Sequence, residues 1–184
     1  MAVRIRSRWH DDSATRSWEQ LASALAFNAW RIAKDKAIGL HGADFVYEDD
    51  HQRIAVIAEH LYFQVQLIDR LAHRALSDDD RGRLVSLTAR ALAEHMQENS
   101  EDLFGPGEHW RAFIAALNER SREYAEYELT EDGPSYPFYR HLGFEIQRIM
   151  GSAGENRWVI DQVMDRDGPD VWKQISRMVR DLLG

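Results

Sequence analysis

Pairs of carboxylate and imidazole side chains at helical spacing are the residues of this sequence with the clearest chemical potential. Asp69 and His73 are four residues apart, as are His141 and Glu145, so on a helix each pair shares one face. A carboxylate beside an imidazole either orients the ring as a base or joins it as a metal ligand. Oxygen and imidazole ligands together suit iron or manganese. These pairs raise the hypothesis of a metal site inside a helical bundle.

The known metal patterns of helical bundles are only partly present. Such bundles place Glu and Glu-x-x-His groups on inward faces, but the motif from Glu48 to His51 falls at the start of a predicted helix and no second helix repeats it. The ferritin-like pattern is therefore incomplete, and the His-x-x-x-His pair of a hemerythrin-like site is missing. The candidate ligands are Glu59, Asp69, His73, Glu94, His95, Glu128, His141 and Glu145.

The same residues also have a structural interpretation. A polar stripe at three- and four-residue spacing is typical of the boundary of an amphipathic helix. This stripe consists of Glu59, Tyr62, Gln66, Asp69 and His73. Glu128 either continues the inward face of its helix, where it needs a partner, or lies at a frayed helix end in water. Both interpretations stay open.

Several mechanisms have no support in the sequence. There is no phosphate-binding GxxxxGK[ST] loop, no GxGxxG, no GxSxG and no HExxH motif. The absence of cysteine excludes disulfides, thiol catalysis and cysteine-ligated metal centres. We therefore favour a protein that is not an enzyme and predict no cofactor, with iron or manganese entering only under the metal hypothesis.

The charge of the chain argues against nucleic acid as its main partner. The formal net charge is -8, whereas phosphate binding depends on clustered Lys and Arg. The exception is an N-terminal arm, residues 1–12, which contains Arg4, Arg6 and Arg8. We interpret the arm as a solvated tail, with a basic binding arm or a strand that pairs with a partner as the alternatives. The sequence lacks a membrane-length apolar run and a secretion signal, so we predict a cytoplasmic protein with no membrane partner.

Apolar residues recur at helical spacing between the four prolines, Pro106, Pro134, Pro137 and Pro169. This pattern predicts an all-α single-domain bundle over residues 13–184, with six main helices, one short helix and mostly antiparallel neighbours. The expected helices cover Ser13 to about Ile38, Asp49 or Asp50 to Leu76, a third capped by Ser77, Glu108 to about Thr130, a fifth capped by Ser135, a short helix over 158–164 and a final helix over 170–183 with Asp170 as its cap.

The second predicted helix is apolar nearly all round. Its main face carries Ile54 and Leu61, while Val56, Phe63 and Leu67 lie on the far side. A helix of this kind is usually either central or covered by a partner chain. The final helix, 170–183, is a second candidate for packing on another subunit.

Three functions are consistent with the sequence. The leading one is an all-helical interaction or assembly protein that forms a homodimer. It rests on the nearly all-round apolar second helix, the abundant aromatic residues and the lack of catalytic motifs, and symmetric dimers are the commonest oligomers. The first alternative is the carboxylate–histidine metal bundle. The second is a sensor or carrier of a small apolar ligand, held in a closed cavity between the second, fourth and fifth helices.

Overall fold

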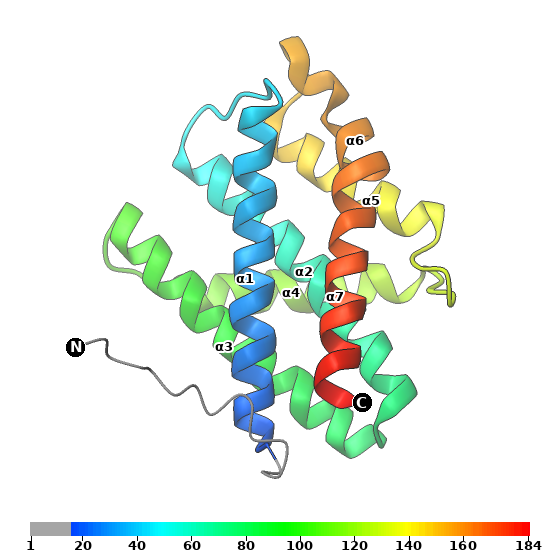
Figure 1. Cartoon of the computed structure of the whole chain (residues 1–184). Coiled ribbons are helices and arrows are strands. Elements are labelled where there is room, and N and C mark those ends of the chain that lie inside the picture. Colours follow the sequence, from blue (N-terminus) through cyan, green and yellow to red (C-terminus); the bar gives the residue numbers. More distant parts are fainter. Residues whose placement is uncertain (1–15) are drawn as a thin grey trace, which may run out of the picture.

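The computed structural model describes residues 16–184 and shows a helical bundle (Figure 1). The N-terminal arm lies outside the described residues. The all-α bundle predicted from the sequence is confirmed. Its elements are α1 (Trp18–Gly42), α2 (Asp50–Ala75), α3 (Asp78–Phe104), α4 (His109–Ala125), α5 (Tyr136–Met150), η2 (Gly154–Trp158), α6 (Val159–Gln162), η3 (Val163–Asp167) and α7 (Gly168–Leu183).

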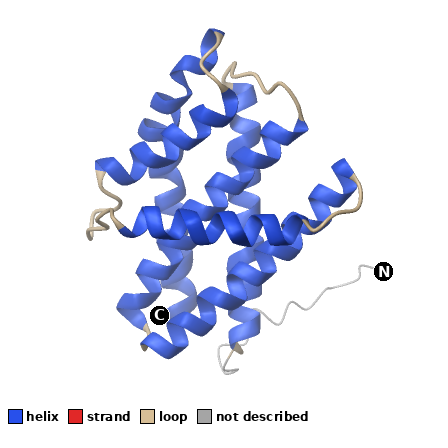
Figure 2. Cartoon of the chain, turned by 180° about the vertical axis from the view of Figure 1, so that it is seen from behind, coloured by secondary structure: helices blue, strands red, loops and turns tan. Residues whose placement is uncertain are grey.

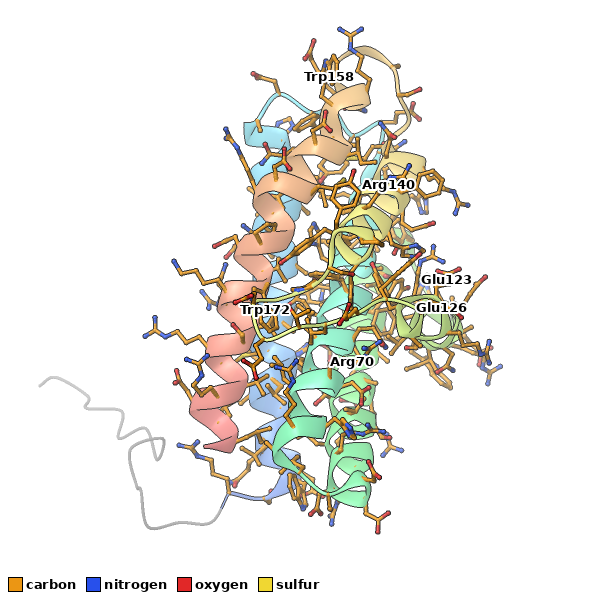
Figure 3. All side chains as sticks on the ribbon, turned by 90° about the vertical axis from the view of Figure 1, so that its right-hand side faces the viewer. Arg70, Glu123, Glu126, Arg140, Trp158 and Trp172 are labelled. Atoms are coloured by element: carbon orange, nitrogen blue, oxygen red, sulfur yellow. The ribbon has the colours of Figure 1, made fainter. Side chains whose placement is uncertain are left out.

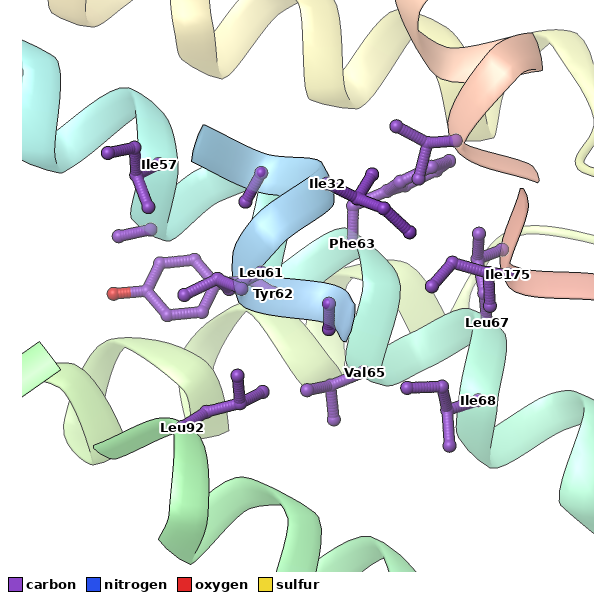
Figure 4. Close-up of a cluster of buried hydrophobic side chains, with 14 of the residues drawn as sticks. Ile32, Ile57, Leu61, Tyr62, Phe63, Val65, Leu67, Ile68, Leu92 and Ile175 are labelled. Atoms are coloured by element: carbon purple, nitrogen blue, oxygen red, sulfur yellow. The ribbon is translucent and has the colours of Figure 1, made fainter. Parts of the chain in front are cut away.

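The apolar second helix is the centre of the bundle. It contacts α1, α3, α4, α5 and α7, so neighbours from its own chain cover it all round. Figure 4 shows Leu61, Phe63, Val65 and Ile68 of α2 packed among side chains of the surrounding helices, including Ile175 of α7. Of the two explanations for an all-round apolar helix, the central position is the one found. The composition of α2 therefore gives no support for a partner chain.

Two faces of the bundle differ in construction. On one, α1 and α7 run antiparallel and side by side (Figure 1). Lys36 of α1 pairs there with Asp170 of α7. On the opposite face, α4 crosses the other helices steeply (Figure 2). The expectation of antiparallel neighbours therefore fits α1 and α7 but not α4. The crossing brings the middle of α4 against α2 and the adjoining α5.

Local capping sets several helix starts as the sequence predicts. The Ser77 hydroxyl accepts from the Asp80 amide at 3.2 Å at the start of α3. Asp49 accepts from the Gln52 amide at 2.8 Å, and the Gln52 side chain accepts from the Glu48 amide at 2.8 Å. Each bond satisfies an amide that has no partner inside the helix.

Other boundaries differ from the prediction. The fourth helix was expected to reach Thr130 but ends at Ala125, where a turn follows and the Thr130 amide donates to the Gly133 carbonyl at 3.0 Å. The first helix begins at Trp18 after its cap Ser17 and runs on to Gly42; the predicted start at Ser13 lies outside the described residues.

The break expected at the last helix is wrong. Asp170 is not a cap, because the chain passes from α6 through one wide π turn, η3, directly into α7. Asp170 instead lies in the first turn of α7, where it pairs with Lys36 and accepts from the Gln174 side chain. Pro169, which has no amide hydrogen, follows directly after the π turn, at the start of α7.

None of the helices within residues 16–184 combines the length and apolar character needed to cross a bilayer.

Candidate functional site

A buried network of charges joins α2, α4 and α5, and the guanidinium of Arg120 is its centre. Arg120 Nε donates to both carboxylate oxygens of Glu59, at 3.1 and 3.0 Å, and its Nη2 donates to Glu59 Oε1 at 3.0 Å. The same Nη2 donates to Glu145 Oε2 at 2.6 Å, and Nη1 donates to Glu123 Oε2 at 3.1 Å. One arginine therefore holds three carboxylates from three helices. We call this set, with its extensions below, the Arg120 network.

The network continues outward from these carboxylates in two directions. Glu145 also accepts from Arg148 Nη1, at 2.9 and 3.0 Å, one turn further along α5. Glu123 Oε2 lies 3.0 Å from His141 Nε2, and His141 Nδ1 lies 3.4 Å from the Tyr127 hydroxyl. Glu123 and Arg148 are the more exposed members of the network, and His141 joins Glu123 to Tyr127.

Burial dominates the electrostatics of the network. Glu59 and Glu145 are each buried, and the loss of solvation raises the pKa of Glu59 despite the hydrogen bonds and charge of Arg120. Burial by itself lowers the pKa of Arg120, but its hydrogen bonds to Glu59 and the neighbouring carboxylates raise the pKa above the usual value. Burial also raises the pKa of Tyr62 and Tyr124, which flank the network. Burial therefore works against the charge on Glu59, and the hydrogen bonds of Arg120 work in its favour.

Aromatic packing positions α4 and α5 for this contact. The Tyr124 ring stacks on Phe138 with centroids 4.9 Å apart and meets His141 edge-on at 4.8 Å. Phe138 in turn meets Phe63 of α2 edge-on at 5.4 Å. Arg70 of α2 donates to the Tyr124 and Ala125 carbonyls at the end of α4, which have no partner inside the helix. Glu123 on α4 and Arg140 on α5 lie on the same side of the bundle (Figure 3).

Three of the eight candidate metal ligands meet in this network: Glu59, His141 and Glu145. They are joined through Arg120 and Glu123 and not through a shared vacant position. Within residues 16–184, no group of three or more His, Asp or Glu side chains is arranged to hold a metal ion. The cationic guanidinium occupies the space between the Glu59 and Glu145 carboxylates, where it supplies the charge that a metal would supply.

The other five candidates lie elsewhere. Asp69 and His73 do not pair with each other, because Arg81 of α3 lies 3.5 Å from the Asp69 carboxylate and 3.1 Å from the His73 ring. Glu94 is exposed on α3, and the His95 ring packs at 5.8 Å from the Trp30 ring. Glu128 is exposed beyond the end of α4, which agrees with the frayed-end interpretation.

Two residues that organise the network, Arg120 and Glu123, were not among the sequence candidates. Their spacing of three residues is the only local signal, and exposed helices carry the same spacing commonly. Arg120 lies one turn after the buried Leu117 and one turn before the buried Tyr124, so it borders the inward face of α4. A bordering arginine is usually solvated, and only the crossing of α4 over α2 makes this one internal.

Next to Glu59 on α2, His60 is fully buried in a different environment. Neither ring nitrogen of His60 has a hydrogen-bond partner. Gln64, one turn further along, donates to the Ala29 carbonyl of α1 at 3.1 Å, which places both side chains on the α1 side of α2. Burial, with a smaller contribution from the charge of Lys36, lowers the pKa of His60 to about 3.

The space between α2, α4 and α5, expected to contain an apolar cavity, is occupied by Phe63, Tyr124, Phe138 and the Arg120 network. Hollows open at the surface instead, and two of them matter for function. One, which we call the α1–α7 groove, has a volume of about 700 Å³. Its lining is Ser23, Ala24, Phe27, Asn28, Arg31, Ile32, Gln174, Arg177, Met178, Asp181 and Leu182.

The second, which we call the α4–α5 hollow, has a volume of about 570 Å³. Its lining is Tyr127, Tyr136, Pro137, Arg140, His141 and Phe144. It lies at the outer end of the Arg120 network, because it shares His141 and Tyr127 with it. Comparison of the chain with protein-family models, curated proteins and solved structures found no match, so the functional inferences rest on these sites.

Proposed function

We propose that this chain is an interaction protein that assembles as a symmetric homodimer through the α1–α7 groove. The observation that carries the proposal is Phe27, whose side chain is 62% exposed on α1 beside the groove. An exposed aromatic ring next to an apolar hollow with a polar rim is typical of a surface that contacts another protein.

The apolar floor of the groove favours a protein partner. Ala24 and Ile32 are buried residues of α1, while Met178 and Leu182 are half-buried residues of α7. Charged residues surround this floor on the rim. An apolar centre with a polar rim is the usual construction of a protein–protein interface.

Self-complementarity favours a second copy of this chain as the occupant. In a two-fold interface the same patch meets itself, so a projecting group must face a hollow of the partner. This patch contains both, since Phe27 projects and the groove recedes. Its rim also carries both signs of charge, with Arg31 and Arg177 against Asp181, so that arginines of one copy can pair with the Asp181 carboxylate of the other.

Sedimentation of the full chain at tens of micromolar tests the proposal, with twice the chain mass as the expected result. Phe27→Asp should weaken the dimer about 30-fold or more, because a central aromatic contact is worth about 2 kcal/mol or more. Ile38→Asp is the matched control, because Ile38 is also on α1 and 56% exposed but lies outside the groove. A monomer at this concentration, or equal effects of the two variants, contradicts the proposal.

Charge reversal provides an independent test of the rim. Arg177→Asp and Asp181→Arg should each weaken the dimer, because each places like charges opposite one another. The double variant reverses both signs and should restore much of the affinity. Within one chain Arg177 and Asp181 also form an i,i+4 pair at 3.8 Å, which the double variant preserves in reversed form.

A further inference from the structure

The outer face of α5 exposes two aromatic rings on either side of a guanidinium. Tyr136, Arg140 and Phe144 are spaced four residues apart, so they lie along one face of the helix. Tyr136 is 69% and Phe144 46% exposed. Tyr127, which follows α4, forms the opposite wall of the α4–α5 hollow. The hollow therefore offers aromatic surfaces with one cation at its rim.

The floor of the hollow is an imidazole held in one orientation. His141 is fixed by Glu123 at Nε2 and lies between the Tyr124 ring at 4.8 Å and the Tyr127 ring at 5.5 Å. Its other nitrogen, Nδ1, is 3.4 Å from the Tyr127 hydroxyl, which is longer than a good hydrogen bond. Nδ1 is therefore available to a ligand without loss of the contact with Glu123.

The charges around the hollow favour an anion. Among the side chains of residues 16–184, Arg140 takes part in no ion pair, and the carboxylate at the floor, Glu123, is engaged by Arg120 and His141. The first turn of α5 contains no acidic residue, so no carboxylate of that turn opposes an anion in the hollow. Arg140 and the start of α5 act on the same hollow.

We propose that the α4–α5 hollow binds a small aromatic carboxylate, independently of the dimer proposed above. The rings of Tyr127, Tyr136 and Phe144 contact the flat body of the ligand, and Arg140 pairs with its carboxylate through the two-pronged geometry that guanidinium and carboxylate share. The volume of about 570 Å³ falls in the range of small-molecule sites.

Titration with 2-naphthoate tests the site directly. We expect saturable binding to the full chain, with a dissociation constant on the order of 0.1–1 mM for a fragment of this size. Calorimetry measures the affinity, and amide NMR shifts locate the ligand at α5 and the end of α4. The neutral analogue 2-naphthylmethanol should bind at least tenfold more weakly, because it lacks the charge that Arg140 recognises.

Substitutions assign the binding to named side chains. Arg140→Ala should weaken 2-naphthoate about tenfold and leave 2-naphthylmethanol nearly unchanged, with partial recovery in Arg140→Lys. Arg111→Ala is the control, because Arg111 lies at the start of α4 and pairs with Glu108 on the surface. Phe144→Ala should weaken both ligands, whereas Trp158→Ala, which removes a half-exposed aromatic outside the hollow, should weaken neither.

Three outcomes overturn the proposal. The first is no saturable binding of 2-naphthoate up to about 5 mM, well above the expected dissociation constant. The second is equal binding of inorganic phosphate, which would mark a general anion site with no role for the aromatic walls. The third is NMR shifts confined to the α1–α7 groove. A monomeric protein that binds 2-naphthoate at α5 would contradict the dimer and leave this proposal intact.

Discussion

Glu59 and His60 are neighbours on α2, both buried, and the protein accommodates them in opposite ways. Glu59 faces α4 and α5, where three guanidinium hydrogen bonds reach its carboxylate. His60 faces α1, where both ring nitrogens lack partners and burial lowers its pKa to about 3. One side of the central helix therefore holds compensated charges, and the other holds a neutral ring.

The two sides of α2 should therefore tolerate different changes. A charged group removed from water needs an opposite charge and hydrogen bonds, so the Glu59 side depends on the simultaneous presence of Arg120 and its other partners. A neutral imidazole needs no counter-ion and behaves largely as a packing group while it stays neutral. The Glu59 side should therefore be sensitive to the loss of a partner, and the His60 side to the gain of a proton.

Removal of the central cation should have the largest effect. Arg120→Met leaves Glu59 buried without a counter-charge and leaves Glu145 with Arg148 as its cationic partner, and we expect the free energy of unfolding to fall by about 3–5 kcal/mol. Urea denaturation at neutral pH measures the change. The control is Arg83→Met, which removes an exposed pair with Glu19 and should leave the free energy of unfolding nearly unchanged, because water screens that pair. Equal losses in the two variants would mean that the network is no more stabilising than a surface pair.

Acidification should act on the other side of α2. The unfolded chain takes up a proton at His60 near pH 6.5, but the folded chain does so only near pH 3. Between these values the unfolded state binds more protons, so stability falls as the pH falls. Between pH 7 and pH 5, His60 should account for about 2 kcal/mol of lost stability.

His60→Leu removes this contribution and should make the loss between pH 7 and pH 5 smaller than in the wild type. His73→Leu is the comparison variant, because the His73 side chain is mostly exposed and its replacement should leave the wild-type loss unchanged. If stability fell by the same amount in wild type and His60→Leu, His60 would take up a proton in the folded protein as readily as in the unfolded chain. The two sides of α2 would then not differ in the way proposed.

The smallest effect is expected for the Tyr124 hydroxyl, which is buried near the network without a hydrogen-bond partner. Tyr124→Phe keeps the ring that packs on Phe138 and removes only the unpartnered oxygen. We expect a change of about 1 kcal/mol or less, with stabilisation as the favoured sign. Thermal and urea denaturation measure it. A loss above about 2 kcal/mol in the free energy of unfolding would show that the Tyr124 hydroxyl stabilises the Arg120 network. Tyr124 would then count among the groups on the Glu59 side of α2 that depend on partners.

Much of the fold could be predicted because its determinants are local. The caps at Asp49 and Ser77 bond to amides three residues away, and the apolar repeat of α2 identifies a covered helix. The errors arise where distant contacts override local patterns. Asp170 has the sequence features of a helix cap, yet Lys36, 134 residues earlier in the chain, engages its carboxylate. At the end of α4, Arg70 of α2 likewise donates to the Tyr124 and Ala125 carbonyls from more than 50 residues away.

The candidate site shows the same division. Glu59, His141 and Glu145 were selected for their residue types, and the structure brings them together. Their organiser could not be selected, because Arg120 is 61 residues from Glu59 and 25 from Glu145, and nothing in one sequence pairs residues at such distances. The carboxylates expected to share a metal share a guanidinium.

By itself, the sequence of this protein determined the helices and most of their starts, since hydrogen bonds and apolar periodicity act over one or two turns. It also gave a central position as one of two explanations for the all-round apolar α2. Only the tertiary structure decided that the second copy is not needed to cover α2, that Arg120 becomes internal and that His60 stays without a partner. These outcomes depend on how α4 crosses α2 and how α1 lies along it. Crossing geometry follows from the packing of whole helix faces, and no local pattern encodes it.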